Sequence, residues 1–346
     1  MRVLADLGHT VVLWGRTAEK ARACVDRLGL GGRVAARAWS GLPASVGRGD
    51  VVVSMLPASE HAALARLAIE NRAHFADTSY VADDVAGLAG AAAAGVVLLA
   101  EAGLDPGLDH LLAHELVAEA EQAVPGPAEA RFTSYCGGIP AVPDDFRYRF
   151  SWAPRGVLTA LLNPARFVDD GQERTVDRPW EDVRSHPVGD EVFEVYPNRD
   201  SVPFSAQYGF PDRWRGRQFV RGTVRHEGWR DAWEPVFAEL RAPDPDRITA
   251  LADDLAARYP TTATDRDRVV LAVSLTVGDW SGTRVVDLVG DADDSAMAKL
   301  VSTPLAAGVN EVVTGRTSAG LHRAAEDAAA VGRVLGFLRG QGITAR

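Results

Sequence analysis

The sequence lacks the features of a secreted, membrane-spanning or metal-dependent protein. Its 346 residues include only two cysteines, Cys24 and Cys136, which are too few for a disulfide framework or a cysteine-bound metal. No apolar run approaches the ~20 residues of a transmembrane helix, and the N-terminus lacks the basic and apolar regions of a signal peptide. No cluster of His, Cys and carboxylate residues has the spacing of metal ligands. We therefore expect a cytoplasmic protein with no membrane partner and no bound metal.

An excess of positive charge is also missing. The chain has 47 acidic and 37 basic residues and a net charge of −10, which argues against general binding of nucleic acid. One segment departs from this balance, and two interpretations of it stay open. It is either a solvated charged surface or a site for an anionic small molecule, since arginine binds carboxylates and phosphates bidentately. The segment contains Arg213, Arg215, Arg217, Arg221, Arg225 and Arg230.

Apolar runs alternate with helical patterns in the first third of the chain. Strands that alternate with helices in this way form a parallel sheet with helices on both faces. The expected fold class is therefore α/β, with a Rossmann-type parallel sheet. The apolar runs predict strands at 10–14, 50–57 and 95–100, of which those at 10–14 and 50–57 are expected to be buried, and a short strand is predicted at 74–77. The helical patterns predict helices at 18–28, 60–71 and 85–94.

The glycine-rich turn that opens a Rossmann fold is missing. Such a fold begins with a strand, the pattern Gly-x-Gly-x-x-Gly and a helix, and the glycines let the backbone approach a pyrophosphate. This chain begins inside what should be that helix, so we hypothesise that the natural start lies further upstream. Arg16 follows the strand at 10–14, where an acidic residue would select NAD and a basic residue suits the 2′-phosphate of NADP. Alternatively, Arg16 is a surface arginine.

A turn between a strand and a helix, at 101–110, is the stretch around which the chain is organised. Asp105 is a candidate N-cap of the following helix, with Pro106 at the first helical position. In open parallel sheets, ligands bind beyond the carboxyl ends of the strands, where helix N–H groups point. Asp105 is therefore either a helix cap alone or a cap that also contacts a ligand.

Beyond residue 127 the strands become longer and the helices rarer, which predicts a second, α+β domain with an antiparallel sheet. Expected boundaries are 1–127 for the first domain, 128–294 for the second and 295–346 for C-terminal helices that return to the first. Within the second domain the pattern predicts strands at 131–136, 191–196 and 218–225, and a hairpin of 269–277 with 285–289 across a turn at 278–282.

Seven motifs together resemble one family, the saccharopine reductases, also called saccharopine dehydrogenase (NADP+, L-glutamate-forming). They occur in the family's order and cover nearly the whole chain. The motifs lie at 79–81, 103–110, 134–140, 150–158, 196–201, 220–225 and 295–301.

The resemblance implies an NADP-binding domain interrupted by a substrate-binding and dimerisation domain, and hence a homodimer. It also implies a reaction, in which 2-aminoadipate semialdehyde and glutamate condense to an imine that NADPH reduces to saccharopine, or the reverse. The substrate would be a small amino acid with several carboxylates. Asp105 and Tyr80 are the candidates for proton transfer. By the same resemblance, the substrate site would contain Ser79, Tyr80, Asp105, Arg199, Thr223, Val224 and Arg225. The residues along NADP would be Arg16, Thr17, Leu56, Pro57, Ser79 and Ala153.

Two other functions stay open. The second domain looks shorter than in the fungal enzymes, notably between Trp233 and Val269, so the substrate can be another amino-acid or polyamine conjugate such as carboxynorspermidine. Because the glycine turn is missing, the chain can also be a cofactor-free relative that binds a metabolite or partner without turnover.

Overall fold

A computed structural model describes residues 1–150, 153–262, 264–324 and 326–346, which form two compact units. The first unit contains residues 1–108 and 300–341, and the second contains 109–299 and 342–346. The chain passes from the first unit to the second after residue 108, whereas the expected boundary was at residue 127. The division of the chain into three segments stays a prediction. Ser151 and Trp152, part of one family motif, lie outside the described residues.

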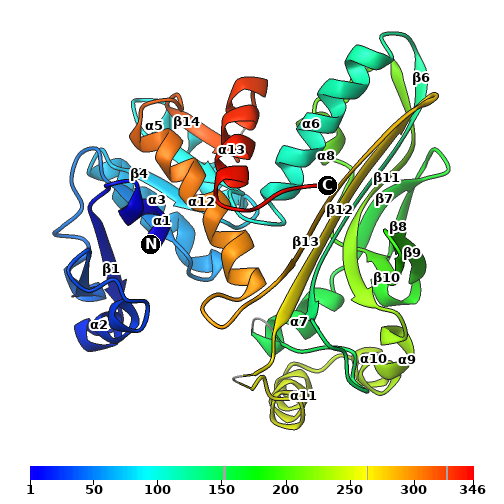
Figure 1. Ribbon diagram of the computed structural model, residues 1–346, viewed down its shortest axis with the longest axis horizontal. Helices are drawn as coiled ribbons and strands as arrows, with labels where there is room; N and C mark the ends of the chain where they lie inside the picture. The colour runs from blue at the N-terminus through cyan, green and yellow to red at the C-terminus, as the bar shows by residue number, and fades with distance from the viewer. Residues whose placement is uncertain (151–152, 263, 325) are drawn as a thin grey trace. The chain divides into compact units, whose positions relative to one another are not determined.

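The first unit is built on parallel strands (Figure 1). Strand β1 (Val11–Gly15) pairs with β2 (Val34–Ala38), and a separate sheet has the order β14, β5, β4, β3. Each pairing is parallel, which confirms the predicted α/β class. The strands of the second sheet are β3 (Val51–Ser54), β4 (His74–Asp77), β5 (Val97–Ala100) and β14 (Gly320–Arg323).

Alternating side chains of the central strands are buried on opposite faces of this sheet. On one face Phe75 and Leu98 pack with residues of helix α3 (His61–Glu70). On the other face Leu99 packs with Leu305 and Val309 of helix α12 (Ala296–Val313). Helices therefore cover both faces, as predicted. The unit's other helices are α1 (Arg2–Asp6), α2 (Ala18–Arg27), η1 (Trp39–Gly41), η2 (Ala58–Glu60), α4 (Asp83–Ala86), α5 (Ala89–Ala92) and α13 (Ala328–Gly340).

Two predictions for the first unit were wrong in detail. The predicted helix at 85–94 is two short helices, α4 and α5, because Gly87 lies at the C-cap of the first and glycine is a poor helix former. Strand β1 was expected to be buried, but all five of its residues are only half-buried. Strand β4, by contrast, has the predicted bounds.

The second unit is built on an eight-stranded sheet, whose main path has the order β13, β12, β6, β11, β10, β9. The pairing of β6 with β11 is parallel, and the other described pairings are antiparallel, so the predicted α+β domain is largely confirmed. The strands are β6 (Ala128–Pro140), β7 (Ala165–Asp169), β8 (Gln172–Val176), β9 (Arg184–Val188), β10 (Glu191–Pro197), β11 (Trp214–His226), β12 (Asp267–Val277) and β13 (Trp280–Val289).

Glycines mark two further corrections. Strand β6 was expected to end at Gly137, but it continues to Pro140. Glycine fits this position because the neighbouring strand β11 comes close, and a Cβ would lie 2.3 Å from the Val224 carbonyl oxygen. The hairpin turn was expected to span 278–282, but β13 already begins at Trp280, so only Gly278 and Asp279 form the turn.

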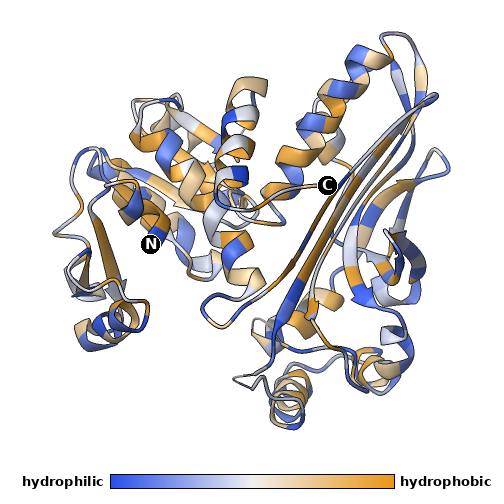
Figure 2. Cartoon of the chain, viewed as in Figure 1, coloured by the Kyte–Doolittle hydropathy of each residue, from blue (hydrophilic) through white to orange (hydrophobic). Residues whose placement is uncertain are grey.

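An aromatic core lies at one end of the second unit, where Trp229, Trp233 and Phe237 are 0–1% exposed. Helix α11 (Pro245–Arg258) contributes Ile248 and Leu255 to it, and Figure 2 shows both apolar and polar colours on this helix. Within the described part of the chain, no helix is both long and apolar enough to cross a membrane. The other helices are α6 (Leu108–Ala123), α7 (Pro154–Leu161), η3 (Pro179–Glu181), α8 (Phe204–Gln207), α9 (Trp229–Ala232) and α10 (Glu234–Leu240).

Candidate active site

In the first unit, the turn after β5 closes on itself instead of capping a helix. The Gly103 N–H donates to the Pro106 carbonyl oxygen over 3.0 Å, and the Leu108 N–H donates to the Gly103 carbonyl oxygen over 2.9 Å. Gly107 has a φ of +143°, and a Cβ there would lie 2.2 Å from the Gly103 oxygen, so the turn requires glycine. The predicted N-cap at Asp105 is therefore wrong, because α6 begins only at Leu108.

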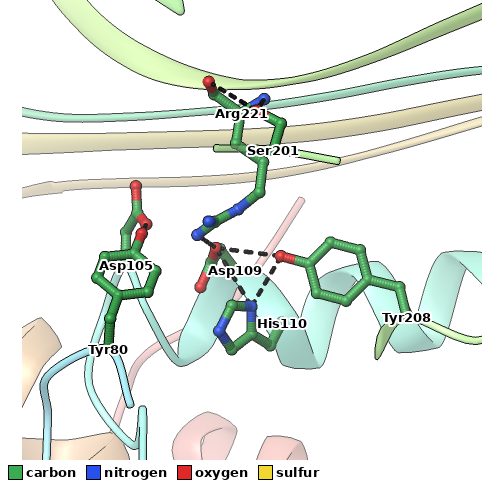
Figure 3. Close-up of polar contacts among 7 residues, drawn as sticks. All are labelled: Tyr80, Asp105, Asp109, His110, Ser201, Tyr208 and Arg221. Carbon is green, nitrogen blue, oxygen red and sulfur yellow. Dashed lines mark hydrogen bonds and ion pairs between the residues drawn. The ribbon is translucent and has the colours of Figure 1, made fainter. Parts of the chain in front are cut away.

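The Asp105 carboxylate is instead held by a phenol. The Tyr80 hydroxyl donates to Asp105 Oδ1 over 2.6 Å (Figure 3). Tyr80 follows β4 and Asp105 follows β5, so both side chains extend from the carboxyl ends of neighbouring parallel strands, and both are half-buried. The structure thus brings together the two residues predicted for proton transfer. A short phenol–carboxylate hydrogen bond is a route along which a proton can move.

Two buried acids hold the loop that carries Tyr80, and sequence reasoning missed both of them. The Ser79 N–H donates to Asp77 Oδ1 over 2.7 Å, and the Val81 N–H donates to Glu101 Oε1 over 3.1 Å. Asp77 and Glu101 are 2% and 3% exposed. Burial, together with the nearby Glu101 charge, raises the pKa of Asp77 to about 7. An acidic residue at the last position of a strand, or directly after it, was the signal that could have found them.

The residues predicted to lie along NADP in the first unit all follow strand ends. Arg16 is exposed in the turn after β1, and the Thr17 hydroxyl accepts the Lys20 N–H as the N-cap of α2. Leu56 and Pro57 are exposed after β3, and Leu56 is 40% exposed despite being apolar.

This set fits part of a dinucleotide. A guanidinium at a helix N-terminus suits a phosphate, and exposed apolar surface beside it suits a ribose or a base. None of these residues supplies the glycine-rich pyrophosphate turn. Ala153, which was also predicted to lie along NADP, belongs to the second unit, where it is the exposed N-cap of α7.

Arg225 in the second unit is surrounded by aromatic rings. It is 7% exposed, and its guanidinium carbon lies 4.9 Å from the ring centroid of Tyr148, 5.5 Å from that of Tyr196 and 5.4 Å from that of Trp229. It donates to the Tyr196 hydroxyl and to the Val224 carbonyl oxygen, while its Nε has no hydrogen-bond partner among the described residues. A buried guanidinium with an unsatisfied N–H has the chemistry to bind an anionic group.

The other arginines between residues 213 and 230 are either exposed to solvent or paired with carboxylates of the chain. Arg215 and Arg230 are exposed, as expected of a solvated surface. Three pair with carboxylates of the chain itself: Arg213 with Glu121, Arg217 with Asp170, and Arg221 with Asp109. Arg225 is therefore the arginine of the segment whose surroundings best suit a ligand.

The remaining predicted substrate residues differ in exposure. Arg199 is exposed just after β10, with a φ of +58°. Thr223 is half-buried and lies opposite Tyr196 in the sheet. Val224 is 0% exposed within an apolar core, so only its main chain can contact a ligand.

A fully buried polar network, which sequence reasoning missed, joins α6, α8 and β11 in the second unit (Figure 3). Arg221 donates to Asp109 Oδ2 over 2.6 Å, and His110 Nδ1 lies 2.7 Å from the Tyr208 hydroxyl. His110 is 0% exposed, so this polar contact is buried. The network anchors the start of α6, the helix that follows the turn of Asp105. In the described residues, no group of three or more His, Cys, Asp or Glu side chains is placed to bind a metal ion.

Comparison with known proteins connects these features to one family. Residues 103–343 match the saccharopine dehydrogenase C-terminal domain, and residues 1–99 match the saccharopine dehydrogenase NADP binding domain. Among curated proteins, the saccharopine dehydrogenase [NADP(+), L-glutamate-forming] of Pyricularia oryzae is 39% identical over 195 residues. The alpha-aminoadipic semialdehyde synthase of Arabidopsis thaliana is 37% identical over 189 residues.

These alignments are partial. They cover 54% and 52% of this chain, but only 42% of the Pyricularia protein and 17% of the Arabidopsis protein. The fold is matched more completely by the apo saccharopine dehydrogenase (L-Glu forming) of Saccharomyces cerevisiae, with a TM-score of 0.80 and 24% identity. That similarity covers 100% of this chain and 95% of the yeast chain.

Proposed function

Because this chain belongs to the saccharopine dehydrogenase family, we propose that it is an NADP-dependent oxidoreductase acting on the C–N bond of saccharopine or a similar secondary amine. The observation that carries the proposal is the 2.6 Å hydrogen bond from Tyr80 to Asp105 at the carboxyl ends of the parallel strands. That pair can accept a proton from a substrate ammonium and return it, which imine formation and reduction both require.

NADPH would supply the hydride for reduction of the imine, and the protein's task is to bind, orient and move protons. Arg16 and Thr17 would hold the 2′-phosphate, Leu56 and Pro57 would pack along the cofactor, and Ser79 and Ala153 would complete its contacts. The exposed position of Arg16 beside a capped helix N-terminus supports this assignment.

Substrate recognition would depend on carboxylate binding. Arg225 has an unsatisfied, buried Nε, which supports its assignment to a substrate carboxylate. Arg199 is assigned to a second carboxylate, and Thr223 with the Val224 main chain to the substrate backbone. Each charge-assisted hydrogen bond of this kind contributes about 1.5–3 kcal/mol.

Steady-state kinetics with NADP+ test the proposal, with saccharopine and carboxynorspermidine compared as substrates. We expect turnover of saccharopine, and Asp105→Asn should lower kcat roughly 10²- to 10⁴-fold, since it removes an acid–base group. Asp83→Asn, an exposed change in α4, is the matched control and should leave kcat unchanged.

Turnover of carboxynorspermidine alone would reassign the substrate. Absence of both NADPH binding and turnover would favour a non-catalytic relative and refute the proposal.

We also propose that the protein acts in the cytoplasm as a homodimer. Two free cysteines, Cys24 and Cys136, are compatible with a reducing compartment. Light scattering on the purified protein tests the dimer, and a monomer mass at micromolar concentration would refute it.

A further inference from the structure

A buried histidine and a buried aspartate connect two loops of the first unit. His61, the first residue of α3, and Asp77, the last residue of β4, are each 2% exposed. His61 Nε2 lies 3.0 Å from the Leu56 carbonyl oxygen, and His61 Nδ1 lies 3.4 Å from Asp77 Oδ2. Asp77 Oδ1 accepts the Ser79 N–H over 2.7 Å. The main chains of Leu56 and Ser79 are therefore joined through two side chains.

The hydrogen-bond partners of His61 show how many protons the His61–Asp77 contact needs. A carbonyl oxygen only accepts hydrogen bonds, so His61 Nε2 must carry a proton. Burial lowers the pKa of His61, which favours the neutral ring, and Nδ1 is then an acceptor. A hydrogen bond between Nδ1 and Asp77 Oδ2 therefore needs one proton, carried by the carboxyl group. Without that proton, a carboxylate oxygen would face the lone pair of the ring nitrogen.

We propose that His61 and Asp77 are positioning residues that share one proton and thereby hold the loops at 55–60 and 78–82 together for cofactor binding. The proposal rests on the proposed function, because these loops carry Leu56, Pro57 and Ser79, the residues assigned to NADP. Neither positioning residue is assigned a contact with cofactor or substrate.

The charged groups around the pair set the pH at which the proton is lost. Burial lowers the pKa of His61, whereas the hydrogen bond to the Leu56 carbonyl and the charge of Asp84 on α4 raise it. Burial raises the pKa of Asp77 to about 7; the Ser79 N–H acts in the opposite direction, and the charge of Glu101, just after β5, adds to the rise. Arg323 on β14 lies 3.7 Å from Glu101. The shared proton should therefore be present in acid and lost as the pH rises through about 7.

Asp77→Asn is the decisive variant. Its amide nitrogen can donate to His61 Nδ1 while its amide oxygen accepts the Ser79 N–H, so it reproduces the protonated acid without titrating. The measurement is the Kd of NADPH from fluorescence titration between pH 6 and 9. As the pH rises through neutrality, we expect the Kd of the wild type to increase roughly 3- to 10-fold more than the Kd of Asp77→Asn, because only the wild type loses a hydrogen bond.

If the Kd of NADPH changes with pH in the same way in the wild type and in Asp77→Asn, the proposal is overturned. His61→Phe, which keeps a ring beside Phe75, should raise the Kd at acidic pH to the wild-type value at alkaline pH. Asp83→Asn, the exposed control, should keep the wild-type profile.

Hydrogen exchange without cofactor separates this proposal from the proposed function. Peptides covering 53–61 and 77–82 should lose protection above pH 7 in the wild type and keep it in Asp77→Asn. If the wild type binds no NADPH at any pH, the proposed function fails, and the exchange result still decides the shared proton. Equal exchange in the two proteins would refute it.

Discussion

The buried pair of Arg221 and Asp109 allows a sharp prediction about stability. The two side chains are 3% and 0% exposed and lie 2.6 Å apart. Removing one partner of such a pair leaves an uncompensated buried charge, which destabilises a protein by about 3–5 kcal/mol. We therefore expect Asp109→Asn to lower the free energy of unfolding by about that amount. An exposed pair, Asp254 with Arg258, provides the control, because Asp254→Asn should change stability by less than ~1 kcal/mol.

Urea denaturation followed by circular dichroism measures Asp109→Asn, Arg221→Met, the double variant Asp109→Asn/Arg221→Met and the control Asp254→Asn. The double variant removes the unpaired charge, so its loss should be smaller than the sum of the two single losses by at least ~2 kcal/mol. A free energy of unfolding for Asp109→Asn within ~1 kcal/mol of wild type, or single losses that add up to the loss of the double variant, would show that the pair does not stabilise the protein in this way.

Three further predictions concern packing, cofactor and substrate. Gly137→Ala should lower the free energy of unfolding by about 1–3 kcal/mol in urea denaturation, because its Cβ would meet the Val224 carbonyl oxygen. Gly126 has open space around it, so the control Gly126→Ala should change the free energy of unfolding little. Arg16→Ala should raise the KM for NADPH roughly 10-fold or more and leave NADH kinetics unchanged. The control Arg22→Ala, an exposed change on α2, should alter neither. Equal effects of Arg16→Ala on both cofactors would contradict the assignment of Arg16 to the 2′-phosphate. Arg225→Lys should raise the KM for saccharopine roughly 10-fold or more, since an ammonium cannot replace the guanidinium fork, and Arg215→Lys on the same strand should match wild type.

The α/β class could be predicted from the sequence because parallel strands buried on two faces leave a simple pattern. Strand β4 was predicted with its observed bounds, and its Phe75 and Ala76 are buried on opposite faces of the sheet. The proximity of Tyr80 and Asp105 could also be predicted, because each follows one of two neighbouring strands.

The errors arose where distant residues override local preference. Asp105 has the sequence context of a helix cap, but its carboxylate accepts the Tyr80 hydroxyl and the helix begins at Leu108. Gly137 resembles a strand end, yet it lies inside β6, where the main chain of the neighbouring strand β11 comes close to it. Asp109 is buried with Arg221, a partner far away in the sequence, which no local pattern shows.

We propose that this protein exchanges a hydride between NADP and a saccharopine-like amine. Product stoichiometry tests this activity most directly, measured by mass spectrometry after incubation of the protein with saccharopine and NADP+. Oxidation and hydrolysis of one C–N bond should release glutamate and 2-aminoadipate semialdehyde, one of each for every NADPH formed. NADPH formation without glutamate, or neither product from a folded protein that binds NADPH, would contradict the proposed activity.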